Sequence, residues 1–140
     1  MREVIFVDTA GWIALGNKDD RWHREAMEAD REMRRYRARR ITTDAVLIEI
    51  GNSLCRLSLR PLAIKLIEEI RLTERLGMTE VVQVDRELLE QGFAFQNRPD
   101  KEWSLTDCIS FAVMQKRSVW RALTTDHHFE QAGFERWLKS

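Results

Sequence analysis

Four acidic residues of this chain stand within or directly after short apolar runs, and these are Asp8, Glu49, Asp107 and Asp126. Glu49, for example, interrupts the run Val-Leu-Ile-Glu-Ile at residues 46–50. An ionised carboxylate in such surroundings is costly unless a cation lies beside it. Residues 42–55 contain no Lys or Arg, and neither do the four residues that follow Asp8. These acids are therefore candidates for binding a metal ion.

Carboxylates that share one site favour a divalent cation. Two carboxylates roughly 4 Å apart repel by about 4 kcal/mol at an effective dielectric constant near 20, and a bound cation removes that cost. Ligand sets made only of oxygen favour Mg²⁺ or Mn²⁺ over Zn²⁺. Such ions activate water and stabilise the charge that develops when a phosphodiester is hydrolysed. We therefore predict that Asp8, Glu49, Asp107 and Asp126 are both metal ligands and catalytic residues.

Three of these acids also have an ordinary structural interpretation. Asp8 follows a strand-like run and suits the N-cap of a helix. Ser104 and Asp107 have the spacing of a capping box, and Asp126 suits a turn. Glu49 has no such structural role, because it is a lone acid in an apolar helical segment. Each acid alone is a weak indication, whereas all four at one edge of a sheet favour a metal site.

Short β-rich runs alternate with helical segments, which is typical of an α/β protein with a parallel sheet. We predict strands at residues 4–7, 40–43, 80–84 and 119–125, with a last edge strand at 134–138. We predict helices at residues 10–15, 20–39, 44–56, 61–76 and 86–96, from 104 onward, and at 127–132. Asp44 and Asp85 are expected N-caps, and Gly77 is expected to end a helix. The expected fold is a single domain over residues 1–140, a three-layer α/β/α sandwich with a central parallel sheet of four to five strands.

This arrangement places the acids at one edge of the sheet. Open parallel sheets bind ligands at the carboxyl ends of their strands. Asp8 follows the first predicted strand and Asp126 follows the fourth. Glu49 and Asp107 can reach the same edge from the first turns of two helices.

Composition indicates an ordinary globular protein. The chain has 140 residues, 44% of them hydrophobic and 33% charged, and its 23 Lys and Arg balance 23 Asp and Glu, so net charge says nothing about a nucleic-acid partner. The two cysteines, Cys55 and Cys108, are expected to be small buried side chains in a reducing compartment. No apolar run approaches the roughly 18 residues that span a membrane, and the apolar stretch at the N-terminus is too short for a signal peptide. We expect a cytoplasmic protein.

Four segments carry a resemblance to a known family. They are Ile5–Ala10, Thr42–Glu49, Ser104–Cys108 with Ala112, and Leu123–Phe134, of which the last is the most specific. The order and setting of the acids in these segments resemble the PIN domain and, more narrowly, the VapC-type toxins of bacterial and archaeal toxin–antitoxin pairs. The pair Thr9-Ala10 departs from the commoner pair of hydroxyl residues at this place.

The resemblance implies a function and a set of partners. It implies an endoribonuclease that depends on Mg²⁺ or Mn²⁺, is the toxin of a type II toxin–antitoxin pair, forms a homodimer and is inhibited by an antitoxin protein. By position, Asp8, Glu49, Asp107 and Asp126 are the implied metal-binding acids, and Thr9, Ser104 and Thr124 are hydroxyl residues that position them. Two alternatives stay open: a PIN-fold nuclease of RNA processing outside such pairs, and an inactive domain that binds RNA or protein.

Phosphotransfer to an aspartate is disfavoured. A receiver domain needs an acid pair at the first strand end and a lysine at a later one, which this chain lacks. A haloacid-type site needs a second Asp two residues after Asp8, where this chain has Ala10.

Several other features allow two interpretations. The six arginines within residues 31–40 could follow an RNA backbone or form a solvated helix face. Trp12 and Trp22 could stack on bases or pack in the core, and the core is favoured. Metal binding by His127 or His128 is disfavoured because the other ligands are oxygens. Apolar residues beyond the needs of one buried face could form a dimer surface or an antitoxin groove, and these are Leu57, Leu59, Leu62, Leu66 and Ile70.

Overall fold

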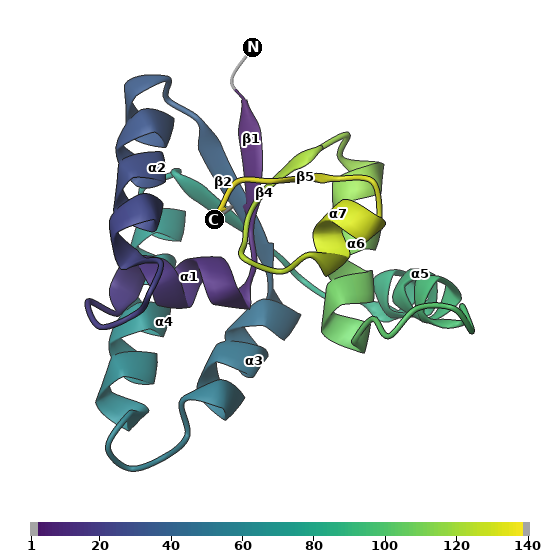
Figure 1. Cartoon of the computed structure of the whole chain (residues 1–140), viewed down its shortest axis with the longest axis horizontal. Helices are drawn as coiled ribbons and strands as arrows, with labels where there is room; N and C mark the ends of the chain where they lie inside the picture. The colour runs from purple at the N-terminus through teal and green to yellow at the C-terminus, as the bar shows by residue number, and fades with distance from the viewer. Residues whose placement is uncertain (1–2, 139–140) are drawn as a thin grey trace.

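A parallel sheet forms the centre of the computed structural model, which describes residues 3–138 (Figure 1). Its strands are β1 (Val4–Val7), β2 (Arg39–Thr43), β3 (Thr79–Val82), β4 (Arg121–Leu123) and β5 (Glu135–Arg136). They lie in the order β3-β2-β1-β4-β5, and each neighbouring pair is parallel. Ile5, Phe6 and Val7 have no exposed surface, as expected of a central strand that is covered on both faces.

Helices cover both faces of the sheet. They are α1 (Thr9–Gly16), α2 (His23–Arg35), α3 (Asp44–Ser53), α4 (Arg60–Arg75), α5 (Arg86–Gln96), α6 (Leu105–Lys116) and α7 (His128–Gln131). Figure 1 shows α1, α2 and α4 on one side of the sheet and α5, α6 and α7 on the other. Helix α1 packs against α2 and α4, and α6 packs against α5 and α7. The predicted three-layer α/β/α sandwich is confirmed.

The strand order changes direction beside β1. The chain builds the sheet outward from β1 to β2 and β3, and then returns to place β4 on the opposite side of β1. Ligands of open α/β sheets bind at such a reversal, beyond the carboxyl ends of the strands. Asp8 follows β1, and Asp126 lies three residues after β4 ends. The topology therefore brings these two acids to the same edge.

Several predicted boundaries shift by a few residues. Helix α2 begins at His23 rather than at residue 20, and it ends at Arg35 rather than at residue 39 because Arg37 adopts φ 55°, a left-handed conformation that does not continue a helix. Asp85 caps α5 as predicted, by accepting a hydrogen bond from the backbone N–H of Leu88. Asp44 is not the N-cap of α3; the hydroxyl of Thr43 accepts that capping bond instead. Gly77 ends the turn after α4 with φ 76°, as predicted.

The two cysteines differ from each other in exposure. Cys108 is buried in α6 as predicted, but the same prediction was wrong for Cys55, which is exposed. Helix α3 ends at Ser53, so Cys55 falls in the connection to α4 rather than on an apolar helix face. Within residues 3–138, no helix is both long and apolar enough to cross a membrane.

Candidate active site

Asp8 lies between β1 and α1, and its side chain contacts both α1 and the residue that follows β4. Its side chain is buried, with one oxygen accepting the backbone N–H of Gly11 at 2.9 Å and the other accepting the hydroxyl of Thr124 at 2.6 Å. Burial raises the pKa of Asp8 to about 7, and the charges of Asp107 and Asp126 act in the same direction, whereas its two hydrogen bonds lower the pKa. Among the residues described, no ion pair includes Asp8. The N-cap interpretation of this residue is correct, and it leaves the charge of Asp8 without a cation.

Gly11 allows α1 to begin directly against β4. A Cβ atom at this position would lie 2.1 Å from the carbonyl oxygen of Leu123. No side chain tolerates such an approach to backbone without displacing the helix. Because Gly11 has no side chain, α1 can pack against β4 closely enough for Asp8 to reach Thr124. The sequence motif did not reveal this requirement for glycine.

The predicted hydroxyl residues behave differently from one another. Thr124 is fully buried; its hydroxyl donates to Asp8 and accepts the backbone N–H of Asp126 at 2.9 Å, so it ties the two acids together. The hydroxyl of Ser104 caps α6 by accepting the backbone N–H of Asp107 at 3.1 Å. Ser104 therefore positions the backbone of Asp107 rather than its carboxylate. Thr9 is buried, but within the described part of the chain its hydroxyl has no hydrogen-bond partner.

Asp107 is surrounded by other acids. Burial raises its pKa to about 6, the charge of Asp126 is the next cause, and the charge of Glu49 also contributes. A hydrogen bond from His128 opposes these effects. Helix α3, which carries Glu49, packs against α6, which carries Asp107. The structure thus brings Asp107 and Asp126 close enough to Asp8, and Asp126 and Glu49 close enough to Asp107, for their charges to raise the pKa values of Asp8 and Asp107.

His128 is the site residue that sequence reasoning set aside. Its Nδ1 atom lies 3.3 Å from Asp107 Oδ2 and 3.3 Å from Asp126 Oδ1, and its backbone N–H donates to Asp126 Oδ1 at 2.9 Å. The potential ligand atoms of Asp126, His127 and His128 all lie within 4.8 Å of one another. Imidazole nitrogens therefore lie beside the acids. This weakens the sequence-based argument against metal binding by His127 or His128, which assumed that all the ligands are oxygens.

The donor set fits a divalent cation. Asp8, Asp107 and Asp126 lie close enough for their charges to interact, and Glu49 lies close enough to act on Asp107. Within residues 3–138, no Lys or Arg forms an ion pair with any of these four carboxylates. A cation at this edge would favour the ionised form of each carboxylate. A set dominated by carboxylate oxygen suits Mg²⁺ or Mn²⁺.

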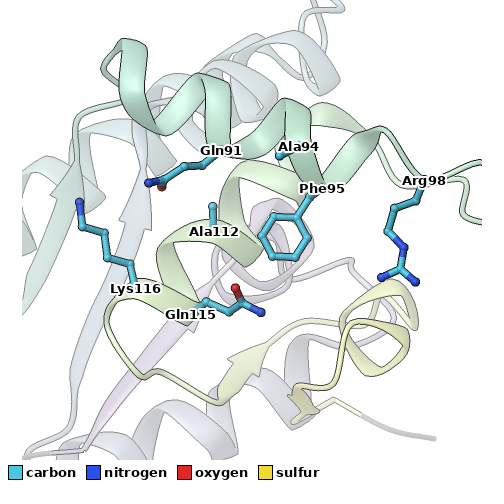
Figure 2. A pocket seen from close by; sticks show the side chains of 7 residues that line it. All are labelled: Gln91, Ala94, Phe95, Arg98, Ala112, Gln115 and Lys116. Atoms are coloured by element: carbon cyan, nitrogen blue, oxygen red, sulfur yellow. The ribbon is translucent and has the colours of Figure 1, made fainter.

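A separate cavity lies away from these acids. Figure 2 shows Phe95, Arg98 and Lys116 among the side chains around this cavity of about 600 Å³, between α5 and α6. None of the predicted site residues lines it. The candidate site is therefore defined by its chemistry and its place at the sheet edge rather than by an enclosed pocket.

The structure also decides between several alternative interpretations. Within the arginine-rich stretch, Arg40 is buried and forms an ion pair with Asp30, so it belongs to the core rather than to a solvated or RNA-binding face. Trp12 is buried and its Nε1–H donates to the hydroxyl of Thr42, which confirms the core interpretation. Of the surplus apolar residues, Leu66 and Ile70 lie in the core, whereas Leu57 is 81% exposed.

Comparison with known proteins identifies the family. A family model described as the PIN domain matches residues 5–135. This match covers most of the chain, including all four acids. The chain therefore belongs to the PIN domain family, as its motifs predicted.

Known relatives match nearly the whole chain. The 23S rRNA-specific endonuclease VapC20 of Mycobacterium tuberculosis, from strains CDC 1551 / Oshkosh and ATCC 25618 / H37Rv, is 34% identical over 141 aligned positions, which cover 94% of this chain and 95% of the relative. The crystal structure of M. tuberculosis VapC20, described as a sarcin-ricin loop cleaving toxin, matches with a TM-score of 0.79 and 32% identity, covering 93% of this chain and 95% of that one. These relatives confirm the predicted resemblance to VapC toxin ribonucleases.

Proposed function

We propose that this protein is an endoribonuclease that uses Mg²⁺ or Mn²⁺ and acts as the toxin of a type II toxin–antitoxin pair. The observation that carries the proposal is the cluster of Asp8, Asp107 and Asp126 where the sheet changes direction, with Glu49 beside Asp107. The VapC20 relatives, which are endonucleases, support the reaction class. An inactive binding domain would have no need to keep Asp8 buried without a cationic partner among residues 3–138.

Each acid has a distinct part in holding the cation. Asp8 is the central ligand, because β1 and the hydroxyl of Thr124 fix its side chain. Asp107 and Asp126 complete the ligand set from α6 and from the loop after β4. Glu49 either binds the ion or orients the attacking water. A bound Mg²⁺ or Mn²⁺ ion supplies a water of lowered pKa and stabilises charge on the phosphoryl oxygens.

The chemical groups at the new RNA ends follow from the nucleophile, which is a water molecule. The water oxygen forms a bond to phosphorus while the bond from phosphorus to the ribose 3′-oxygen breaks. The 3′-oxygen leaves as a hydroxyl, and the phosphate stays on the 5′ side of the next nucleotide. Because the ribose 2′-hydroxyl does not attack, no cyclic phosphate forms.

The proposed substrate is structured ribosomal RNA, since the VapC20 relatives act on 23S rRNA. The proposed protein partners are an inhibiting antitoxin and a second copy of the chain, in the cytoplasm. Apolar side chains on and before α4 support a protein partner, because Ile64 and Leu72 are 52% and 47% exposed and Leu57 is 81% exposed.

The purified protein should cleave RNA only when a divalent ion is present. Total RNA and intact ribosomes are incubated with the protein in Mg²⁺, in Mn²⁺ or in excess EDTA, and the new 5′ ends are mapped. We expect discrete cleavage with either ion, 5′-phosphate ends, and no cleavage in EDTA until the ion is restored. Unchanged cleavage in EDTA would falsify metal dependence.

Growth arrest on expression should require the same acids. Wild type, Asp126→Asn and Asp85→Asn are each expressed in a bacterial host from a repressible promoter. Asp85, like Asp126, accepts a backbone N–H from a residue two or three positions later, but it is exposed and lies outside the acid cluster, so it is a matched control. We expect growth arrest from wild type and Asp85→Asn and growth from Asp126→Asn at equal protein levels. Equal arrest by all three would show that toxicity is not catalytic.

A further inference from the structure

His128 connects two acids that come from different parts of the chain. Asp107 lies in the first turn of α6, whereas Asp126 lies in the loop after β4. The Nδ1 atom of His128 forms a hydrogen bond with Asp107 and lies at the same distance, 3.3 Å, from Asp126. Both neighbours of Nδ1 are carboxylate oxygens, which only accept hydrogen bonds when ionised. Nδ1 of His128 therefore carries a hydrogen in this contact.

Two observations indicate that this position of the ring is maintained by the fold. The backbone N–H of His128 donates to Asp126, which closes the turn and directs the ring back toward α6. The side chain of His128 is 24% exposed and that of Asp107 is 14% exposed, whereas the side chain of the preceding His127 is 65% exposed. Within residues 3–138, His127 lies 3.8 Å from Asp126 Oδ1 and beside the ring of His128, but it forms no ion pair with Asp107.

We propose that His128 is a positioning residue for the metal-binding carboxylates, and that its Nδ1–H holds Asp107 in the orientation that accepts the cation. This inference rests on the proposed function, because it assumes that Asp107 and Asp126 bind the cation. A carboxylate that binds metal through one oxygen can accept a hydrogen bond on the other, and such outer partners fix the ligand's orientation. Without His128, Asp107 can turn away from Asp126 to relieve the repulsion between them.

The test measures Mn²⁺ binding to the metal-free full chain without RNA. Isothermal titration is carried out at pH 8.5, above the pKa of about 7 for Asp8 and of about 6 for Asp107. His128→Ala should raise the dissociation constant by about 10- to 100-fold, the loss typical of a missing outer partner. Asp85→Asn, at an exposed site outside the acid cluster, should bind Mn²⁺ as wild type does.

His128→Asn separates positioning from packing. The amide nitrogen of Asn occupies nearly the same place as Nδ1, so this variant should recover most of the lost affinity, whereas His128→Gln, with its amide one bond farther out, should not. If His128 only packs, His128→Ala will lower stability in urea while its Mn²⁺ affinity stays that of wild type. Where His128→Ala does not fold, the comparison of His128→Asn with His128→Gln carries the test.

The outcomes separate this inference from the proposed function. If wild type binds Mn²⁺, Asp8→Asn does not, and all the His128 variants bind as wild type, the metal site stands and the role of His128 is overturned. Tighter binding by His128→Ala also overturns it, since the imidazole would then compete with the cation. If wild type itself binds no Mn²⁺, the metal site of the proposed function fails, and this inference fails with it.

Discussion

Asp8→Asn should reduce the rate of RNA cleavage by on the order of 10³-fold. Loss of an outer partner of a metal ligand typically costs about 10- to 100-fold, and loss of the charge on the central ligand should cost more. Asn keeps the size of Asp8 and one acceptor oxygen, so the fold should persist. The measurement is the initial rate of cleavage of a defined ribosomal RNA fragment in saturating Mn²⁺, with circular dichroism to confirm folding.

Asp85→Asn provides the matched control for that loss. Asp85 accepts the capping N–H of Leu88 at the start of α5, as Asp8 accepts that of Gly11 at the start of α1. Both substitutions therefore alter an aspartate N-cap, but only Asp8 lies among the acids. Activity near that of wild type for both variants would remove Asp8 from the catalytic site, and equal loss in both would assign the effect to helix capping.

The metal-free protein should lose stability relative to Asp8→Asn as pH rises. The pKa of Asp8 is about 7 in the folded chain and about 3.9 in an unfolded one. Between these values the folded state holds more protons than the unfolded state, so the free energy of unfolding falls with rising pH. Asn does not titrate. From pH 5 to pH 8.5 the free energy of unfolding of Asp8→Asn should therefore rise by about 2–3 kcal/mol relative to that of wild type.

The comparison between two pH values removes an opposing effect. Asn offers one oxygen where Asp8 accepts from both Gly11 and Thr124, and the lost hydrogen bond costs about 0.5–1.5 kcal/mol at either pH. Urea unfolding in EDTA measures both proteins at both pH values. A stability difference that does not change with pH, or that moves toward wild type as pH rises, would contradict the buried, unpaired state of Asp8. Asp85→Asn, at an exposed site, should show no such change relative to wild type.

The acidic edge was predictable because strand ends are easy to locate in this sequence. The apolar run before Asp8 identifies a buried central strand, and the run before Asp126 identifies its neighbour. Parallel strands bring their carboxyl ends to one edge, so these two acids had to approach one another. The helix that starts at Ser104 was equally clear, because a hydroxyl residue precedes its apolar side.

The contacts that sequence reasoning missed depend on side-chain directions set by tertiary structure. His128 meets Asp107 only because the turn at Asp126 directs its ring toward a helix 21 residues earlier. The arginine stretch that includes Arg40 allowed a solvated or an RNA-binding face, yet the strand buries Arg40 against Asp30. The sequence did not indicate that residue 11 must be glycine, because the constraint comes from the carbonyl oxygen of Leu123, on a strand that is distant in the sequence. Local patterns carry none of this information.

The central claim is that the acids form one shared metal site, and thermal unfolding with and without Mn²⁺ tests it most directly. Wild type and Asp8→Asn are melted at pH 8.5, first in EDTA and then in Mn²⁺. Wild type should be stabilised by about 2.7 kcal/mol when Mn²⁺ exceeds the dissociation constant about a hundredfold, and Asp8→Asn should respond little. A wild type that gains nothing from the ion, or a variant that gains as much, would show that these carboxylates do not share a cation.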